Sequence, residues 1–179
     1  MCWGSIEGNF QKNLTDIRIA IAGDLHGSWS QDDLDLLLEL NPDGVLFVGD
    51  LSDGDLRIVR GINKISIPTS VVLGNHDRGR DGSGNVLQAQ LDLLGEKNCS
   101  WNLSKWTLNE LSVVGARPCS GGGGFFLTPE VKSVFGEVSL DESVFRIVSA
   151  AKSAPLDFPL LILAHSGPVG LGSEASSLC

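Results

Sequence analysis

Short runs of apolar residues alternate, from residue 17 onward, with segments whose apolar positions recur at helical spacing. Each apolar run ends in a glycine or a polar cluster before the helical segment begins, which is the order found in βαβ units. The pattern predicts strands at 17–23, 44–49, 69–74 and 158–167, and helices at 30–40, 55–65, 85–95 and 141–154. This alternation predicts an α/β fold.

Two segments depart from the regular pattern. Residues 105–116 indicate a hairpin or two edge strands, and four consecutive glycines at 121–124 indicate a flexible surface loop. That loop either borders a site or is slack, meaning a flexible connection without a role in a site. Glycine runs usually mark such flexible connections. With no internal repeat and no second pattern, the chain is expected to hold one domain at 17–179 after an N-terminal extension at 1–16.

The first predicted helix has clear end signals. Ser30 is a typical N-cap, and Asp32 and Asp33 in the following turn suit the positive end of a helix dipole. Asn41 and Pro42 end the helix, because the residue before a proline disfavours helical backbone.

The composition is that of a globular protein with a negative surface. Apolar residues make up 42% of the 179 residues, charged residues make up 20%, and the formal net charge is -9. Such a charge repels phosphate backbones and anionic membranes, which disfavours nonspecific nucleic-acid binding and membrane association. A small ligand bridged by metal ions is easier to accommodate.

Cysteine usage and the N-terminal sequence indicate an intracellular protein. The cysteines show no C-x-x-C spacing, so we expect free thiols in a reducing compartment at Cys2, Cys99, Cys119 and Cys179. The first residues lack the features of a signal or transit peptide, and no apolar run approaches the ~20 residues of a membrane span. We expect a soluble protein of the cytoplasm, or of a plastid if a longer plant form carries a transit peptide.

Residues of metal-ligand type stand at the ends of the predicted strands and include all three histidines of the chain. In chain order they are Asp24 and His26, Asp50 and Asp53, Asn75 and His76, and His165. Because the carboxyl ends of the strands of an open α/β sheet gather along one rim, we expect four separate segments to supply one site.

The local spacing supports this expectation. Alternate residues of an extended chain point the same way, so Asp24 and His26 are expected to face a common ion while Leu25 turns toward the core. A glycine before a polar cluster permits a sharp turn or a close backbone approach. Such glycines are Gly23, Gly49 and Gly74.

Each of these residues alone has a simpler explanation. A histidine at a strand end is commonly a hydrogen-bonded structural residue, Asp53 and Asp55 suit a helix cap, and "GNHD" suits an Asx turn. These explanations do not account for four clusters at once, so the set favours a metal site. Carboxylate, imidazole and amide ligands together suit Mn, Fe or Zn, and a carboxylate can bridge two such ions.

These motifs, in this order, resemble those of the calcineurin-like metallophosphoesterases. The family signature is D-x-H, G-D-x-x-D, G-N-H-D/E, a later strand-end His and a final G-H-x-H, and the chain matches the first four blocks between residues 18 and 168. Within the family, "GDLHGSW" and "HSGP" look most like a cyanobacterial and plant subgroup. The resemblance implies a layered sandwich of mixed β-sheets flanked by helices.

The resemblance also implies a ligand set for two divalent or trivalent ions. Asp24 and His26 would bind the first ion, Asp50 would bridge the two, and Asn75 and His165 would bind the second. The implied cofactors are Mn, Fe or Zn, and the implied substrate is a small phosphomonoester or phosphodiester.

The implied reaction is hydrolysis of the ester by a metal-bridged hydroxide. His76 would be the general acid beside the leaving group, and Asp53 the carboxylate that orients His76.

Two positions depart from the family pattern. Some phosphatases of the family have Arg where Gly54 stands here, so Arg78 or Arg80 would have to supply any substrate-binding guanidinium, unless both are solvated surface charges. No histidine follows His165, so the G-H-x-H block and its ligand for each metal are absent. We therefore expect a truncated or alternatively spliced form that lacks the closing strands of the family.

Two functions are open on this sequence. The first is a metal-dependent phosphoesterase, and the second is a catalytically weak remnant that binds metal or phosphate and acts through a partner. The number of bound metal ions separates them, since two ions favour the enzyme and one or none favours the remnant.

Overall fold

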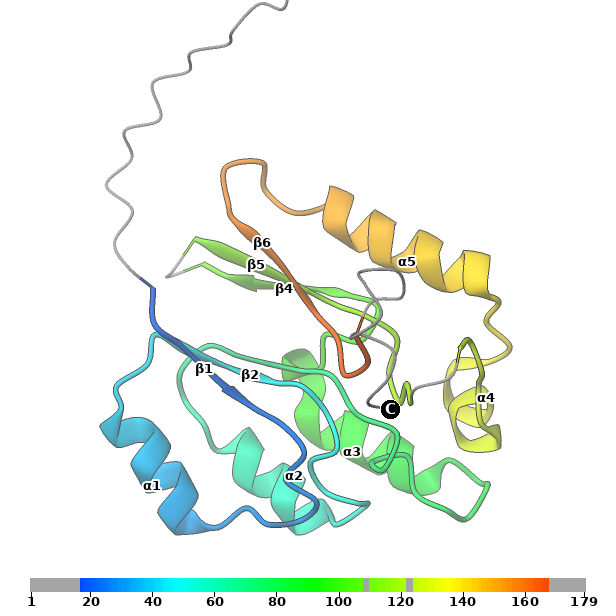
Figure 1. Ribbon diagram of the computed structural model, residues 1–179, viewed down its shortest axis with the longest axis horizontal. Helices are drawn as coiled ribbons and strands as arrows, with labels where there is room; N and C mark the ends of the chain where they lie inside the picture. Colours follow the sequence, from blue (N-terminus) through cyan, green and yellow to red (C-terminus); the bar gives the residue numbers. More distant parts are fainter. Residues whose placement is uncertain (1–16, 108–109, 122–123, 168–179) are drawn as a thin grey trace, which may run out of the picture.

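Two three-stranded β-sheets packed face to face form the centre of the protein (Figure 1). The computed structural model describes residues 17–107, 110–121 and 124–167. The strands are β1 (Ile19–Ala22), β2 (Gly44–Phe47), β3 (Thr69–Val71), β4 (Leu103–Trp106), β5 (Leu111–Gly115) and β6 (Leu160–Leu163). The first sheet has the order β1-β2-β3 with all strands parallel. In the second, β5 pairs with β4 in antiparallel and with β6 in parallel orientation.

Helices form the outer layers. They are α1 (Gln31–Glu39), α2 (Leu56–Asn63), α3 (Asn85–Leu94), α4 (Pro129–Phe135) and α5 (Leu140–Lys152), with a 3-10 turn at Gly95–Lys97. Figure 1 shows α1, α2 and α3 on the side of the first sheet that faces away from the second sheet, and α5 along the second sheet. Among the described residues, no helix has the length and apolar character needed to cross a lipid bilayer.

The predicted α/β sandwich with mixed strand directions and flanking helices is confirmed, including the hairpin formed by β4 and β5. The observed strands are shorter than predicted, so the polar clusters that follow them lie on loops. α4 was not predicted, because it has only seven residues and lies between a glycine run and Gly136, where the sequence resembles a loop. Residues 1–16 and 168–179 lie outside the described residues, so the N-terminal extension and the missing closing strands stay predictions.

Two groups of buried apolar side chains hold the layers together. The first joins the first sheet to its helices and includes Phe47 and Ile62. The second lies between the sheets and includes Leu46 and Trp106. All four residues of β2 are buried, as expected of a strand covered on both faces. A Cβ at Gly44 would lie 2.3 Å from Trp106 Cζ3, so the sheets approach too closely there for any side chain.

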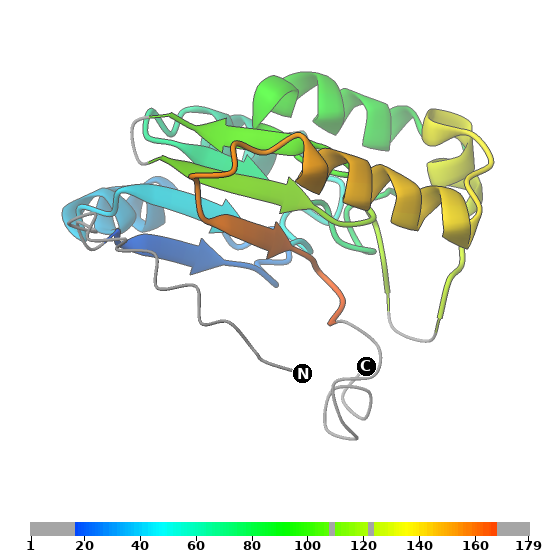
Figure 2. The same ribbon diagram turned by 90° about the horizontal axis from the view of Figure 1, so that it is seen from above.

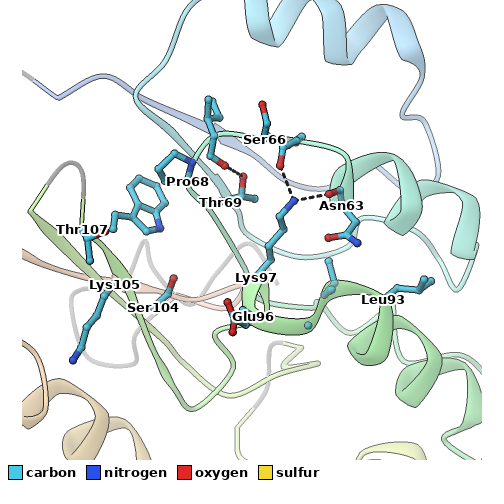
Figure 3. A pocket seen from close by; sticks show the side chains of 15 residues that line it. Asn63, Ser66, Pro68, Thr69, Leu93, Glu96, Lys97, Ser104, Lys105 and Thr107 are labelled. Carbon is cyan, nitrogen blue, oxygen red and sulfur yellow. Dashed lines mark hydrogen bonds between the residues drawn. The ribbon is translucent and has the colours of Figure 1, made fainter.

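A groove of about 610 Å³ opens at the amino end of β3, between α2, α3 and β4 (Figure 3). Lys97 Nζ donates hydrogen bonds there to the carbonyl oxygens of Asn63 at 2.6 Å and Ile65 at 2.7 Å, which closes the end of α2. No predicted site residue lines this groove, because they follow the opposite, carboxyl ends of the strands.

The first turn of α1 is closed by reciprocal hydrogen bonds between Ser30 and Asp33. Ser30 Oγ accepts from Asp33 N at 3.3 Å, and Asp33 Oδ2 accepts from Ser30 N at 2.8 Å and from Ser30 Oγ at 2.7 Å. These bonds, above all the one from the Ser30 side chain, hold the pKa of the Asp33 carboxyl below its usual 3.8. The N-cap predicted from the sequence is therefore confirmed.

Replacing Ser30 by alanine is expected to lower the free energy of unfolding at neutral pH by about 1 kcal/mol, as is typical of a lost N-cap. A carboxylate whose pKa is lower in the folded than in the unfolded state stabilises the fold at pH values above its unfolded-state pKa. That stabilisation is lost as the pH falls through the folded-state pKa. The difference between wild type and variant should therefore shrink below about pH 4. Urea unfolding of both proteins at neutral and acidic pH measures this difference in the free energy of unfolding. A difference that does not change with pH would contradict a contribution from ionised Asp33.

Candidate metal centre

The loops that follow β1 and β2 run side by side at the carboxyl end of the first sheet. Asp24 N donates to Gly49 O and His26 N donates to Asp50 O, each at 3.0 Å. One potential ligand atom from each of Asp24, His26 and Asp50 lies within 4.8 Å of the other two. The loops thus bring together the residues predicted for the first ion and the residue predicted to bridge both.

The expectation that Asp24 and His26 lie on an extended chain is wrong. β1 ends at Ala22, and the φ angles of Asp24 and His26 are 52° and 46°, in the left-handed region. Asp50 has a φ of 51° as well. Leu25 does pack against the core, but the loop and not a strand turns it inward. Left-handed backbone is unfavourable for residues with a side chain and concentrates at functional sites.

His165 reaches the same place from the second sheet. It follows β6, its Nε2 lies 3.2 Å from Asn75 Oδ1 and 3.4 Å from Asp50 Oδ2, and its Nδ1 lies 2.7 Å from Val48 O. The prediction of a single sheet rim therefore needs correction. The predicted ligands lie where the carboxyl ends of β1 and β2 meet the carboxyl end of β6 from the facing sheet, and Figure 2 shows that β1 and β6 run in the same direction.

Two glycines permit this close approach. A Cβ at Gly49, whose φ is 96°, would lie 2.7 Å from both His165 Nδ1 and Gly74 N. A Cβ at Gly74 would lie 2.2 Å from Asp50 Oδ1. Both distances are too short for real atoms, so a side chain at either position would displace a predicted ligand. The close approach expected of these glycines is confirmed.

Asp53 lies between two histidines. His26 Nδ1 is 3.0 Å and His76 Nδ1 is 3.8 Å from Asp53 Oδ1, and the two rings meet edge to face with centroids 4.9 Å apart. The hydrogen bond to Asp53 raises the pKa of His26 above 6.5, partial desolvation opposes the rise, and the charges of Asp53, Asp50 and Asp24 add to it. Asp53 is therefore closer to His26 than to His76, the residue with which the resemblance pairs it.

Asp55 is the residue that caps α2. Its Oδ1 accepts from Arg57 N at 2.8 Å, and its Oδ2 accepts from Arg57 Nη2 at 2.6 Å. The capping explanation is therefore correct for Asp55 and wrong for Asp53, whose carboxylate faces the histidines.

Arg78 is anchored beside the site. Its Nη1 donates to Asn75 O, and its Nε lies 3.7 Å from Glu130 Oε2 in α4. Glu130 is buried, and its Oε1 accepts from Gly82 N at 3.1 Å. Arg78 is thus a partly buried, paired cation, whereas Arg80 is exposed. A substrate-binding role for Arg78 stays a prediction.

The start of the glycine run borders the site. Gly74 and Ser120 form an isolated parallel bridge, and Ser120 O accepts from Ser166 Oγ at 2.9 Å. A Cβ at Gly121 would lie 3.4 Å from Asn75 Cγ. The interpretation of the run as mere slack is therefore wrong for Gly121, and residues 122–123 lie outside the described residues.

Three buried polar residues behind the site were not predicted. Asp77 and Gln90 have no exposed surface and Ser52 is 1% exposed. Burial raises the pKa of the Asp77 carboxyl, while hydrogen bonds from Ser52, Gly74 and Leu51 act in the opposite direction. The available signal was Gln90, a polar residue on the otherwise apolar buried face of α3.

A family model described as calcineurin-like phosphoesterase matches residues 17–172. The match covers most of the chain and every predicted site residue. The chain belongs to the calcineurin-like phosphoesterase family. No curated protein and no solved structure matches it. Membership in this phosphoesterase family, together with the clustered ligand-type residues, supports a hydrolase that acts on phosphate esters with the help of metal ions.

Proposed function

We propose that this phosphoesterase hydrolyses a phosphomonoester or phosphodiester at a dinuclear metal centre. The observation that carries the proposal is the convergence of His165 Nε2, Asp50 Oδ2 and Asn75 Oδ1 beside the group of Asp24, His26 and Asp50. Asp50 belongs to both groups, so its carboxylate is suited to link two ions.

The protonation of His165 supports a cation at the second group. A carbonyl oxygen only accepts, so the contact of Nδ1 with Val48 O places a proton on Nδ1 and leaves the lone pair of neutral imidazole on Nε2. That lone pair faces the oxygens of Asp50 and Asn75, and a metal ion held between these three atoms would bind all of them. Two ligands bound at about 2.0–2.2 Å lie roughly 3.0–3.6 Å apart, which matches the observed separations.

The first group also offers ligands for a divalent ion. Asp24 and Asp50 supply carboxylate oxygens, and the hydrogen bond of His26 Nδ1 to Asp53 leaves Nε2 of His26 as its ligand atom. Two bound ions would lower the pKa of water and neutralise the phosphoryl oxygens. Oxygen and nitrogen ligands without thiolate favour Mn, Fe or Zn.

His76 is placed to move a proton. Its side chain is 39% exposed, so a substrate oxygen can reach it, and Asp53 lies on its Nδ1 side. We assign to His76 the donation of a proton to the leaving oxygen as the ester bond breaks, and to Asp53 the orientation of the ring. The exposed fractions of His26 and Asp53, 44% and 41%, describe an open site that suits a small ester.

Removal and return of metal tests the proposal. Protein treated with a chelator is expected to lose hydrolysis of nitrophenyl phosphate or bis-nitrophenyl phosphate, and added Mn²⁺ is expected to restore it, because the ligand set holds the ions that activate water. Elemental analysis is expected to find two ions per chain. Hydrolysis that is indifferent to the chelator would contradict the proposal, and one ion or none without hydrolysis would favour the remnant that acts through a partner.

A further inference from the structure

The Asp77 carboxylate ties together the two loops that carry most of the site. Its Oδ1 accepts from Leu51 N at 2.9 Å, from Ser52 N at 2.7 Å and from Ser52 Oγ at 3.1 Å. Its Oδ2 accepts from Gly74 N at 2.8 Å. One buried side chain therefore fixes the loop that contains Asp50 to the loop that contains Asn75 and His76.

Gln90 connects this link to α3. Its Oε1 accepts from Ser52 Oγ at 2.6 Å, and its Nε2 donates to the carbonyl oxygen of Asp77 and, at 3.4 Å, to that of Val86. The amide therefore holds a residue from each loop against the helix. Because Gln90 is fully buried, these bonds are not exchanged for bonds to water.

The Asp77 link acts on the ligands through short covalent paths. Leu51 follows Asp50 directly, and Gly74 precedes Asn75 directly. Asp50 Oδ1 also accepts a hydrogen bond from His76 N at 2.8 Å. This bond can form only while the two loops keep their relative position. A shift at Asp77 therefore changes the separation of Asp50, Asn75 and His76.

A neutral amide cannot replace the carboxylate. All donors to Asp77 are N–H or O–H groups, and they occupy both oxygens. Asparagine has the same shape but offers an acceptor on one side only, so its NH₂ group would meet either Gly74 N or the donors of Leu51 and Ser52. The site therefore requires a residue that accepts at both ends.

We propose that Asp77 is a positioning residue of the metal centre, which sets the separation of the Asp50 loop and the Asn75–His76 loop through Ser52 and Gln90. This proposal rests on the proposed function, because it presupposes that these loops bind metal. Asp77 has no exposed surface, so it acts only through the residues that it holds.

The proposal is tested by calorimetric titration of Mn²⁺ into wild type, Asp77→Asn and Ser70→Ala. Each protein is titrated below its unfolding temperature. Asp77→Asn is expected to bind Mn²⁺ about 10–100-fold more weakly, the loss typical of residues that orient ligands. Ser70→Ala is the matched control, because Ser70 is as fully buried and hydrogen-bonded to Trp106 Nε1 and Ser104 Oγ between the sheets. It is expected to lose stability and keep its Mn²⁺ affinity.

The outcomes separate the two proposals. Wild type that binds no Mn²⁺ would overturn the proposed function. If wild type binds Mn²⁺, either of two results would overturn the positioning role. One is a folded Asp77→Asn that binds Mn²⁺ as tightly as wild type. The other is a Ser70→Ala that binds Mn²⁺ as weakly as Asp77→Asn. If Asp77→Asn does not fold, Gln90→Met takes its place, since it removes both ends of the Gln90 amide at similar volume. Unchanged Mn²⁺ affinity in that variant would equally overturn the role of the network.

Discussion

Replacing Asp50 by asparagine is expected to lower the rate of metal-dependent phosphate-ester hydrolysis by about 10³-fold and to leave the protein folded. Asn keeps the volume of the side chain and the oxygen that accepts from His76 N. It removes the negative charge from the one residue shared by both ligand groups. The loss of several kcal/mol of charge stabilisation at the ions gives the expected factor.

The measurement is kcat at saturating Mn²⁺ for wild type and Asp50→Asn. Asp55→Asn is the matched control, because Asp55 lies a few residues along the same segment, caps α2 and belongs to neither ligand group. Its activity is expected to equal that of wild type, since Asn is as good an N-cap as Asp. An Asp50→Asn protein that retains its metal-dependent rate, or a control that loses as much, would show that Asp50 does not link the ions.

The sequence was sufficient to predict which of these residues gather at one place in the fold, because the βα pattern fixes where strands end. Asp24, His26 and Asp50 follow neighbouring parallel strands, and the loops that carry them are hydrogen-bonded to each other. The glycines at 49 and 74 were informative for a physical reason, since each stands where a Cβ would overlap the neighbouring loop. Short-range rules therefore predicted correctly that Asp24, His26 and Asp50 lie close together.

Contacts between distant segments were beyond those rules. The place of His165 in a second sheet depends on how two sheets face each other, and strand periodicity carries no information on that packing. The pairing of Arg78 with Glu130 depends on α4, whose seven residues give too little periodicity to predict a helix. Asp77 was visible as a residue of the G-N-H-D block, but only the structure shows that its carboxylate binds backbone groups of two loops.

The loop conformations were mispredicted for a related reason. The sequence predicted that Asp24 and His26 point the same way because they alternate along an extended strand. In the structure β1 has already ended, and left-handed backbone sets the direction of both side chains. Such backbone is held in place by the surrounding hydrogen bonds, here those to the β2 loop. Local propensity alone disfavours it, so a sequence-based prediction defaults to the extended form.

Replacing His76 by glutamine is expected to lower kcat by about 10²–10⁴-fold for an ester with a strongly basic leaving group, and far less for a nitrophenyl ester. A strongly basic leaving oxygen needs a proton as its bond to phosphorus breaks, whereas a nitrophenolate leaves readily without one. The Nδ1 of His76 lies 3.8 Å from Asp53 Oδ1, so the carboxylate is placed to orient the ring.

The test compares kcat for phenyl phosphate and nitrophenyl phosphate in wild type, His76→Gln and His26→Gln at saturating Mn²⁺. His26→Gln is the matched control, because His26 shares the Asp53 contact and edge-to-face ring packing but belongs to the first ligand group. Loss of a metal ligand is expected to slow both substrates by a similar factor, since both need the same activated water. His76 protonates the leaving oxygen only if His76→Gln lowers kcat much more for phenyl phosphate than for nitrophenyl phosphate. Equal losses of kcat for the two substrates would place the contribution of His76 at the phosphoryl group or the attacking water instead.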